Sequence, residues 1–158
     1  MSQSAIKTIQ QLNPAAINIG GANGTNFAVI ERRRNRQAET LNIDQFGLST
    51  VESLISAQIM QNQYPIIATG GIQSANDVIT SLMLGATLVS SAGFMLKTLM
   101  DDGQSALVQQ IEGWQSALPR LLTLLGAQSN QELAEKQRLY SPSLQNFITQ
   151  QKASPENR

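Results

Sequence analysis

The feature that most constrains this chain is residues 65–93, in which two apolar runs each stop at a glycine turn. The first run ends at Gly70–Gly71, a helical pattern follows, and the second run is followed by Ala92–Gly93. Strand, glycine turn, helix, strand and glycine turn is the order by which the last quarter of a (β/α)8 barrel holds a phosphate group. Paired glycines let the backbone approach an anion, and the following helix directs free N–H groups at it. The stretch therefore predicts a site for a phosphorylated ligand.

The rest of the chain alternates helical and strand patterns. A third apolar run, 15–19, ends at Gly20–Gly21 and indicates a buried strand. Helices are predicted over 2–12, from Ser49, from Ser74, over 107–125 and from Ser129, and each of these serines can cap its helix. The alternation predicts an α/β fold of right-handed βαβ units with a parallel sheet. Three strands are too few for a closed barrel or for a five-stranded flavodoxin-like sheet.

Several boundaries follow from local signals. Gly85 is placed to end a helix in the left-handed conformation, and Pro119 is expected to interrupt the long helix. Residues 22–48 are polar and aperiodic, and we expect them to be disordered in the isolated chain. The chain turns polar near its end, so we predict a partial barrel over 1–147 and a disordered tail over 148–158.

The composition excludes several kinds of site in these 158 residues. Without cysteine there is no disulfide, thiolate nucleophile or iron–sulfur ligation, and without histidine there is no histidine triad or histidine-bound metal. Eleven basic residues balance eleven acidic ones, so no overall field attracts nucleic acid or an anionic membrane. The arginines of 32–36 form either a solvated loop face or an anion-binding patch. With no membrane-spanning run and no signal segment, we expect a soluble, cytoplasmic protein.

The three predicted strands all end in small residues at one edge of the sheet, where parallel-sheet proteins bind ligands. Alone, each glycine pair is only a turn, and the segment 20–25 lacks the lysine of a P-loop and the spacing of a dinucleotide motif. Together they favour a phosphate site. Trp114 and the leucines around it are interpreted as core, and Lys97 as a surface lysine.

Four stretches resemble type II isopentenyl diphosphate isomerase, a family of FMN-dependent (β/α)8 barrels. They are INIGGANGTNFAVIERRRN, FGLSTVESLISAQ, IIATGGIQSANDVITSLMLGATLVSSAGFML and GWQSALPRLLTLLGAQSNQEL, which follow the family's order over almost the whole chain. The resemblance implies the C-terminal part of such a barrel, about strands six to eight, starting at an internal methionine. The flavin-ring, substrate and Mg²⁺ residues would lie before it, so we assign no catalytic and no metal-binding residue.

The resemblance also implies which residues hold the phosphate of FMN. They are Gly20, Thr25, Gly71, Ile72, Gln73, Ala92 and Gly93. Gly20 stands where the family usually has serine and Gln73 where it often has arginine, and each change removes a phosphate contact. We therefore expect a lower FMN affinity than in a typical member.

The family interconverts isopentenyl and dimethylallyl diphosphate in isoprenoid biosynthesis, with FMN reduced by NADPH and with Mg²⁺. The resemblance implies this activity for the full-length enzyme, and we expect the fragment alone to be inactive. An alternative is a phosphate- or flavin-binding half-barrel that forms homo-oligomers, because open strands leave edges that need pairing. A third possibility is a fragment of an unrelated phosphosugar barrel, which the signature Gly24–Phe27 disfavours.

Overall fold

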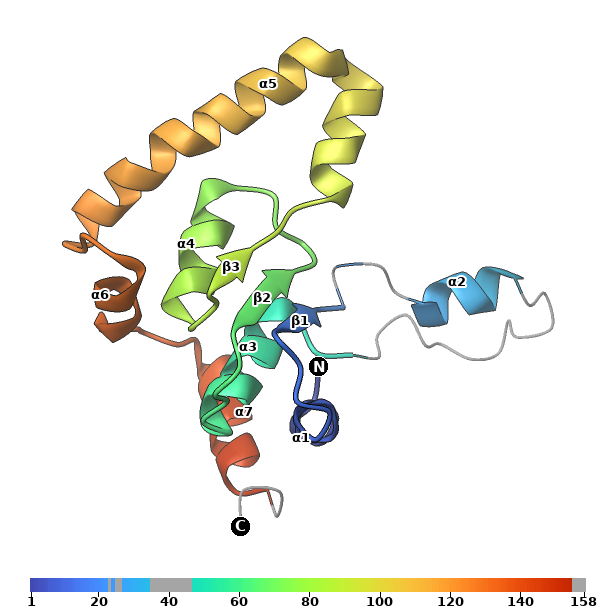
Figure 1. The fold of residues 1–158 in the computed structure, drawn as a ribbon, viewed down its shortest axis with the longest axis vertical. Coiled ribbons are helices and arrows are strands. Elements are labelled where there is room, and N and C mark those ends of the chain that lie inside the picture. The colour runs from blue at the N-terminus through green and yellow to red at the C-terminus, as the bar shows by residue number, and fades with distance from the viewer. Residues whose placement is uncertain (23, 25–26, 35–46, 155–158) are drawn as a thin grey trace.

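The computed structural model describes residues 1–22, 24, 27–34 and 47–154, and a parallel sheet lies at its centre (Figure 1). Its strands are β1 (Ile17–Gly20), β2 (Ile66–Thr69) and β3 (Leu88–Val89), in the order β1-β2-β3. Both neighbouring pairs are parallel, with Ile17 opposite Ile66 and Ile67 opposite Leu88. The predicted three-stranded parallel sheet is confirmed.

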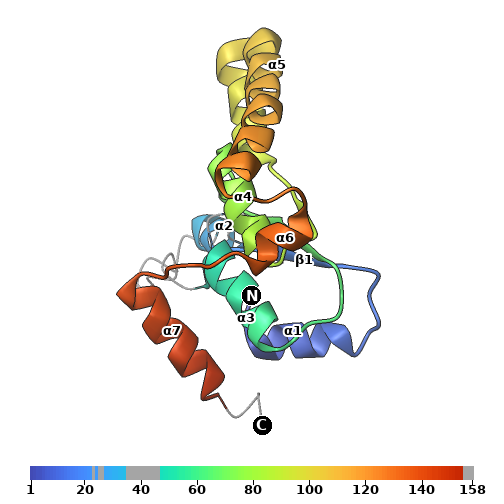
Figure 2. The ribbon, with the colours of Figure 1, turned by 90° about the vertical axis from the view of Figure 1, so that its left-hand side faces the viewer.

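Helices connect and cover these strands. They are α1 (Gln3–Gln10), α2 (Phe27–Arg34), α3 (Thr50–Ile59), α4 (Ala75–Met83), α5 (Gly93–Leu124), α6 (Asn130–Glu135) and α7 (Pro142–Lys152). Helix α3 packs on β1 and β2, and α4 packs on β3. Helix α7 lies against α3, whereas α5 arches over α4 towards α6 (Figures 1 and 2). None of the described helices combines the length and the apolar character that crossing a lipid bilayer requires.

The sheet has one covered and one open face. On the helix side, Ile17, Ile19 and Ile66 are almost fully buried and form the main core with α3, α1 and α7. On the opposite side, Asn18 is exposed and 61% of Leu88 is exposed. Side chains alternate between the faces of a strand, so in a closed barrel the open face would be the interior.

The helix starts predicted at Ser49 and Ser74 are confirmed by their hydrogen bonds, whereas the helix predicted over 107–125 begins earlier, at Gly93. At α3, Ser49 Oγ accepts from Glu52 N at 3.2 Å, and Glu52 Oε2 accepts from Ser49 N at 2.7 Å, which completes a capping box. At α4, Ser74 Oγ accepts from Asp77 N. Gly85 has a φ of 88° just after α4, as its predicted left-handed position requires.

The predicted interruption at Pro119 is wrong, because α5 continues through this residue. Proline removes only one N–H donor, and Pro119 is exposed to solvent. The bend lies instead at Gly103, whose φ of 87° and ψ of 177° are open essentially only to glycine. The predicted core around Trp114 is only partly formed: no residue of α5 is fully buried, although Leu118 packs against a second cluster around Leu133.

Two predicted irregular segments contain helices. Within 22–48, residues of α2 are helical, and 35–46 lie outside the described part of the chain. In the arginine cluster, Arg34 forms an exposed ion pair of 3.1 Å with Glu31. The boundary predicted at residue 147 falls inside α7, which runs to Lys152 because Ile148 is buried against the main core. Residues 155–158 lie outside the description.

Candidate functional site

The carboxyl ends of the three strands open into one cleft of about 820 Å³. Six of the seven predicted site residues line it: Gly20, Gly71, Ile72, Gln73, Ala92 and Gly93. The seventh, Thr25, lies outside the described residues. A volume of several hundred Å³ is typical of small-molecule and cofactor sites. The structure therefore brings together the turns that the sequence places far apart.

The first and second turns touch through glycine backbone. A Cβ on Gly24 would lie 3.1 Å from Gly70 Cα, and a Cβ on Gly70 would lie 3.0 Å from Gly21 N. Gly70 also has a φ of 90°, a conformation that other residues rarely adopt. The contact between the two turns therefore leaves no room for a Cβ at Gly24 or Gly70, whether or not a ligand is bound.

Thr50 ties the same turns to helix α3, and sequence reasoning missed it. Its hydroxyl donates to Gly70 O at 2.6 Å and lies 3.1 Å from Thr69 O. A Cβ on Gly21 would meet Thr50 N at 2.1 Å, so the start of α3 lies directly against the first turn. In the sequence, Thr50 is visible only as a threonine immediately after a capping serine. A helix start alone gives no reason to expect a contact with β2.

The second and third turns are joined by side-chain hydrogen bonds. Ser91 Oγ donates to Ile72 O at 2.7 Å. Asp77 Oδ2 accepts from Gln73 N at 3.0 Å and from Ser74 Oγ at 2.8 Å. The turn that carries Ile72 is thus fixed by α4 on one side and by the end of β3 on the other.

The start of α5 differs from the other helix starts that the structure describes. Helices α1, α3, α4, α6 and α7 each have a serine whose hydroxyl accepts a backbone N–H. Helix α5 has Ala92 at this position and no side-chain cap. A Cβ on Gly93 would meet no atom within 4 Å, so the space beside this residue is open. An uncapped helix start leaves N–H donors and positive partial charge for an anion.

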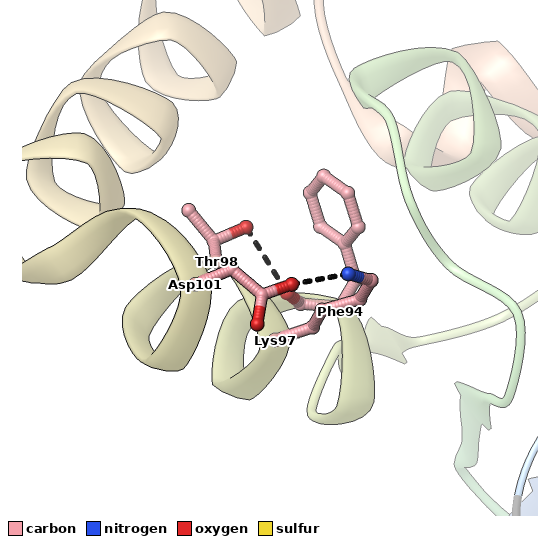
Figure 3. Close-up of polar contacts among 4 residues, drawn as sticks. All are labelled: Phe94, Lys97, Thr98 and Asp101. Atoms are coloured by element: carbon pink, nitrogen blue, oxygen red, sulfur yellow. Dashed lines mark hydrogen bonds and ion pairs between the residues drawn. The ribbon is translucent and has the colours of Figure 1, made fainter.

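Lys97 is the one charged side chain among the described residues that line the cleft. It lies one turn after Gly93 and pairs with Asp101 (Figure 3). The hydrogen bond that Lys97 donates to the Asp101 carboxylate, together with the negative charge of that carboxylate, raises the pKa of Lys97. The Phe94 ring, also at the cleft, stacks on Trp114 with centroids 6.0 Å apart and an interplanar angle of 6°. Neither Lys97 nor Phe94 is among the site residues that the sequence predicts.

The chemistry of the lining limits what the cleft can do by itself. Among its described lining residues there is no carboxylate, and the polar groups are backbone amides, the side-chain amides of Asn18 and Gln73, hydroxyls and one ammonium group. Within the described ranges, no three acidic side chains converge in a way that could hold a metal ion. The arrangement is suited to binding an anion rather than to general acid–base catalysis.

Comparisons with known proteins show what this chain is similar to. A family model described as FMN-dependent dehydrogenase matches residues 43–140. The isopentenyl-diphosphate delta-isomerase of Lactococcus lactis subsp. lactis is 46% identical over 152 residues, which are 96% of this chain and 43% of that protein. The protein of the same name from Limosilactobacillus reuteri (strain JCM 1112) is 39% identical over 151 residues, 95% of this chain and 43% of its own. This chain thus spans less than half the length of these relatives.

Solved structures show the same fold. The recombinant flavin-binding domain of baker's yeast flavocytochrome b2 aligns with a TM-score of 0.52 at 20% identity, over 92% of this chain and 43% of that one. A flavocytochrome b2 variant with benzoylformate gives the same values. The identity is too low to carry function, but the alignment shows that the three strands and their helices form part of a (β/α)8 barrel.

Proposed function

Because this chain belongs to the FMN-dependent dehydrogenase family, we propose that its cleft binds the phosphate end of FMN within an isopentenyl-diphosphate isomerase. The observation that carries the proposal is the convergence of three strand-end turns on a cleft that also contains the uncapped start of α5. The names of the relatives support the isomerase as the whole enzyme.

The residues present fit a phosphate group. Ala92 and Gly93 offer the first-turn N–H groups of α5 without a competing cap, and the space beside Gly93 is open. The turn of Gly71, Ile72 and Gln73 forms the neighbouring wall, held by Ser91 and Asp77. Gly20 and, by resemblance, Thr25 would complete the site on the β1 side.

In this proposal the chain's own residues bind and orient the cofactor. When bound in its reduced form, FMN would supply the proton-transfer chemistry that the lining residues lack. The hydrogen bonds of Thr50 and Ser91 hold the turns in place before the ligand arrives, which lowers the cost of binding. Reduction by NADPH and a requirement for Mg²⁺ belong to the proposal through the resemblance alone, and we assign no residue here to either.

We expect these 158 residues alone to bind FMN without turning over isopentenyl diphosphate. The open face of the sheet, with Asn18 and Leu88 exposed, provides only one wall of an active site. A one-sided site cannot exclude water or position both flavin and alkene.

The test is FMN titration of the purified chain, followed by the fluorescence of Trp114, its single tryptophan. Trp114 stacks on Phe94 at the cleft, so occupancy should change its emission. Gly93→Asp should abolish the response, because a carboxylate would compete for the helix N–H groups and repel phosphate. Gly113→Asp is the matched control: Gly113 is also a helical glycine with no atom within 4 Å of its Cβ, and it does not line this cleft. Because Gly113 precedes Trp114, the FMN response of each variant is measured relative to its own emission without FMN.

Two outcomes would count against the proposal. If the unaltered chain does not respond to FMN, the cofactor site is wrong. If the two aspartate variants bind FMN equally, the site lies elsewhere. An isomerase assay with reduced FMN, Mg²⁺ and isopentenyl diphosphate addresses the catalytic part, since substantial turnover by this chain would contradict the expected inactivity.

One observation favours a second candidate, a self-associating flavin-binding half-barrel. The strands β1 and β3 both lie at edges of the sheet, and Leu88 exposes an apolar side chain on the open face. Two copies could cover these surfaces. Size-exclusion chromatography with light scattering distinguishes the two, because a monomer at micromolar concentration would rule out the self-associating form.

A further inference from the structure

Lys97 lies where a charged ligand group would meet helix α5. Gly93, Lys97 and Asp101 are four residues apart in turn, which places them on one face of the helix. Gly93 and Lys97 both line the cleft. The first-turn N–H groups and the ammonium group are therefore presented from the same side of α5.

The present partner of Lys97 is weakly held. Figure 3 shows the Asp101 carboxylate paired with the ammonium group, and the two side chains are 53% and 74% exposed. Exposed ion pairs of this kind contribute little to stability because water screens them. The hydroxyl of the neighbouring Thr98 donates a hydrogen bond to Phe94 O at 3.1 Å, so it is not used in the ion pair. Lys97 can exchange its partner without disturbing the fold.

A phosphate group would be the stronger partner. It carries nearly two negative charges near neutral pH, and charge-assisted hydrogen bonds to it are stronger than neutral ones. The other described lining residues bring no charge, so Lys97 is their sole source of positive side-chain charge. Lysine is protonated throughout the neutral range, and Asp101 raises the pKa of Lys97 further.

We propose that Lys97 contacts the phosphate group of the ligand and that Asp101 is its counter-ion when the cleft is empty. This inference rests on the proposed function and adds a residue to it. Lys97 thereby favours a phosphorylated ligand over a non-phosphorylated one. Asp101 competes with the phosphate group for the ammonium group of Lys97.

The test compares FMN, riboflavin and inorganic diphosphate as ligands of the full 158-residue chain. Lys97→Gln should weaken FMN binding by about tenfold and leave riboflavin binding unchanged, while Lys97→Arg keeps the charge and should retain most of the FMN affinity. Asp101→Asn should strengthen FMN binding a few-fold by removing the competing carboxylate. Glu31→Gln removes the acidic partner of another exposed helix ion pair, Glu31–Arg34, and should change nothing.

The outcomes separate this inference from the proposed function. If Lys97→Gln binds FMN and diphosphate as tightly as the unaltered chain, the inference is overturned while the FMN site stands. If only diphosphate binding falls, Lys97 serves the phosphate of a diphosphate ligand rather than that of the flavin, which still supports the inferred contact. If the unaltered chain binds neither phosphate ligand, both proposals fail.

Discussion

The hydroxyl of Thr50 donates a hydrogen bond of 2.6 Å to the carbonyl oxygen of Gly70. Thr50 is the first residue of α3 and is buried, whereas Gly70 follows β2 and begins the second glycine turn. The bond fixes the turn at the centre of the cleft to a helix that belongs to the preceding βα unit. The geometry of the candidate site thus depends on a residue that does not itself line the cleft.

Thr50→Val should lower the free energy of unfolding by about 1–3 kcal/mol, because it keeps the side-chain shape but removes the hydroxyl that donates to the partly buried carbonyl oxygen of Gly70. Thr50→Ser keeps the hydroxyl and should be milder. Urea denaturation of both variants measures the difference. Equal stability of the two variants would show that the hydrogen bond to Gly70 contributes nothing.

Gly70→Ala should cost about 1–3 kcal/mol, since its φ of 90° strains any residue with a Cβ and its Cβ would lie 3.0 Å from Gly21 N. Gly20→Ala is the comparison, because a Cβ there meets only Thr69 Cγ2 at 3.8 Å. We expect Gly20→Ala to change stability by no more than about 0.5 kcal/mol. The melting temperatures of the two variants test this, and a similar loss in both would contradict the glycine contact.

Gly103→Ala should destabilise the bend of α5 through backbone strain alone, because no atom lies within 4 Å of the added Cβ. The expected cost is about 1–3 kcal/mol. Gly113→Ala, in regular helix and equally unobstructed, should instead stabilise by about 0.5–1 kcal/mol. The melting temperature, measured by circular dichroism, should therefore fall for Gly103→Ala and rise for Gly113→Ala.

The alkaline limit of FMN binding should depend on Asp101. Lys97 has a raised pKa, so its charge persists up to a higher pH than that of an ordinary lysine and is lost as the pH rises through the folded-state value. Asp101→Asn removes the main cause of the shift and should move the loss of Lys97-dependent binding to lower pH. Titration of FMN affinity from pH 8 to 11 in both proteins measures this. Identical pH profiles of FMN affinity in the two proteins would show that Lys97 does not contact the phosphate group.

Much of the local structure was predictable because its causes are local. The serines at 49, 74 and 129 begin helices in the structure as predicted, since a capping hydroxyl acts on N–H groups two or three residues away. Gly85 ends its helix with a positive φ for an equally local reason. The resemblance of four stretches to an isopentenyl diphosphate isomerase is also confirmed, by relatives named isopentenyl-diphosphate delta-isomerase at up to 46% identity.

The errors arose where distant contacts decide the outcome. Pro119 looked like a helix break, but the packing of Leu118 and Leu122 keeps α5 continuous through it, and the bend falls at Gly103. Ile148 lies in a polar stretch, yet it is buried against the main core, so α7 extends beyond the predicted boundary. Lys97 is exposed, as its interpretation as a surface lysine implies, but only the fold shows that it also lines the cleft beside the turns.

By itself the sequence determined the three strands, their glycine turns, the capped helices and the family, because short-range hydrogen bonds and apolar periodicity are written in neighbouring residues. Only the tertiary structure decided that Gly24 touches Gly70, that Thr50 holds the second turn, and that Lys97 is the charge at the cleft. These contacts join segments that lie far apart along the chain or depend on the space that other segments leave. Such proximity is set by how parallel strands align and how helices pack across them, which no local pattern encodes.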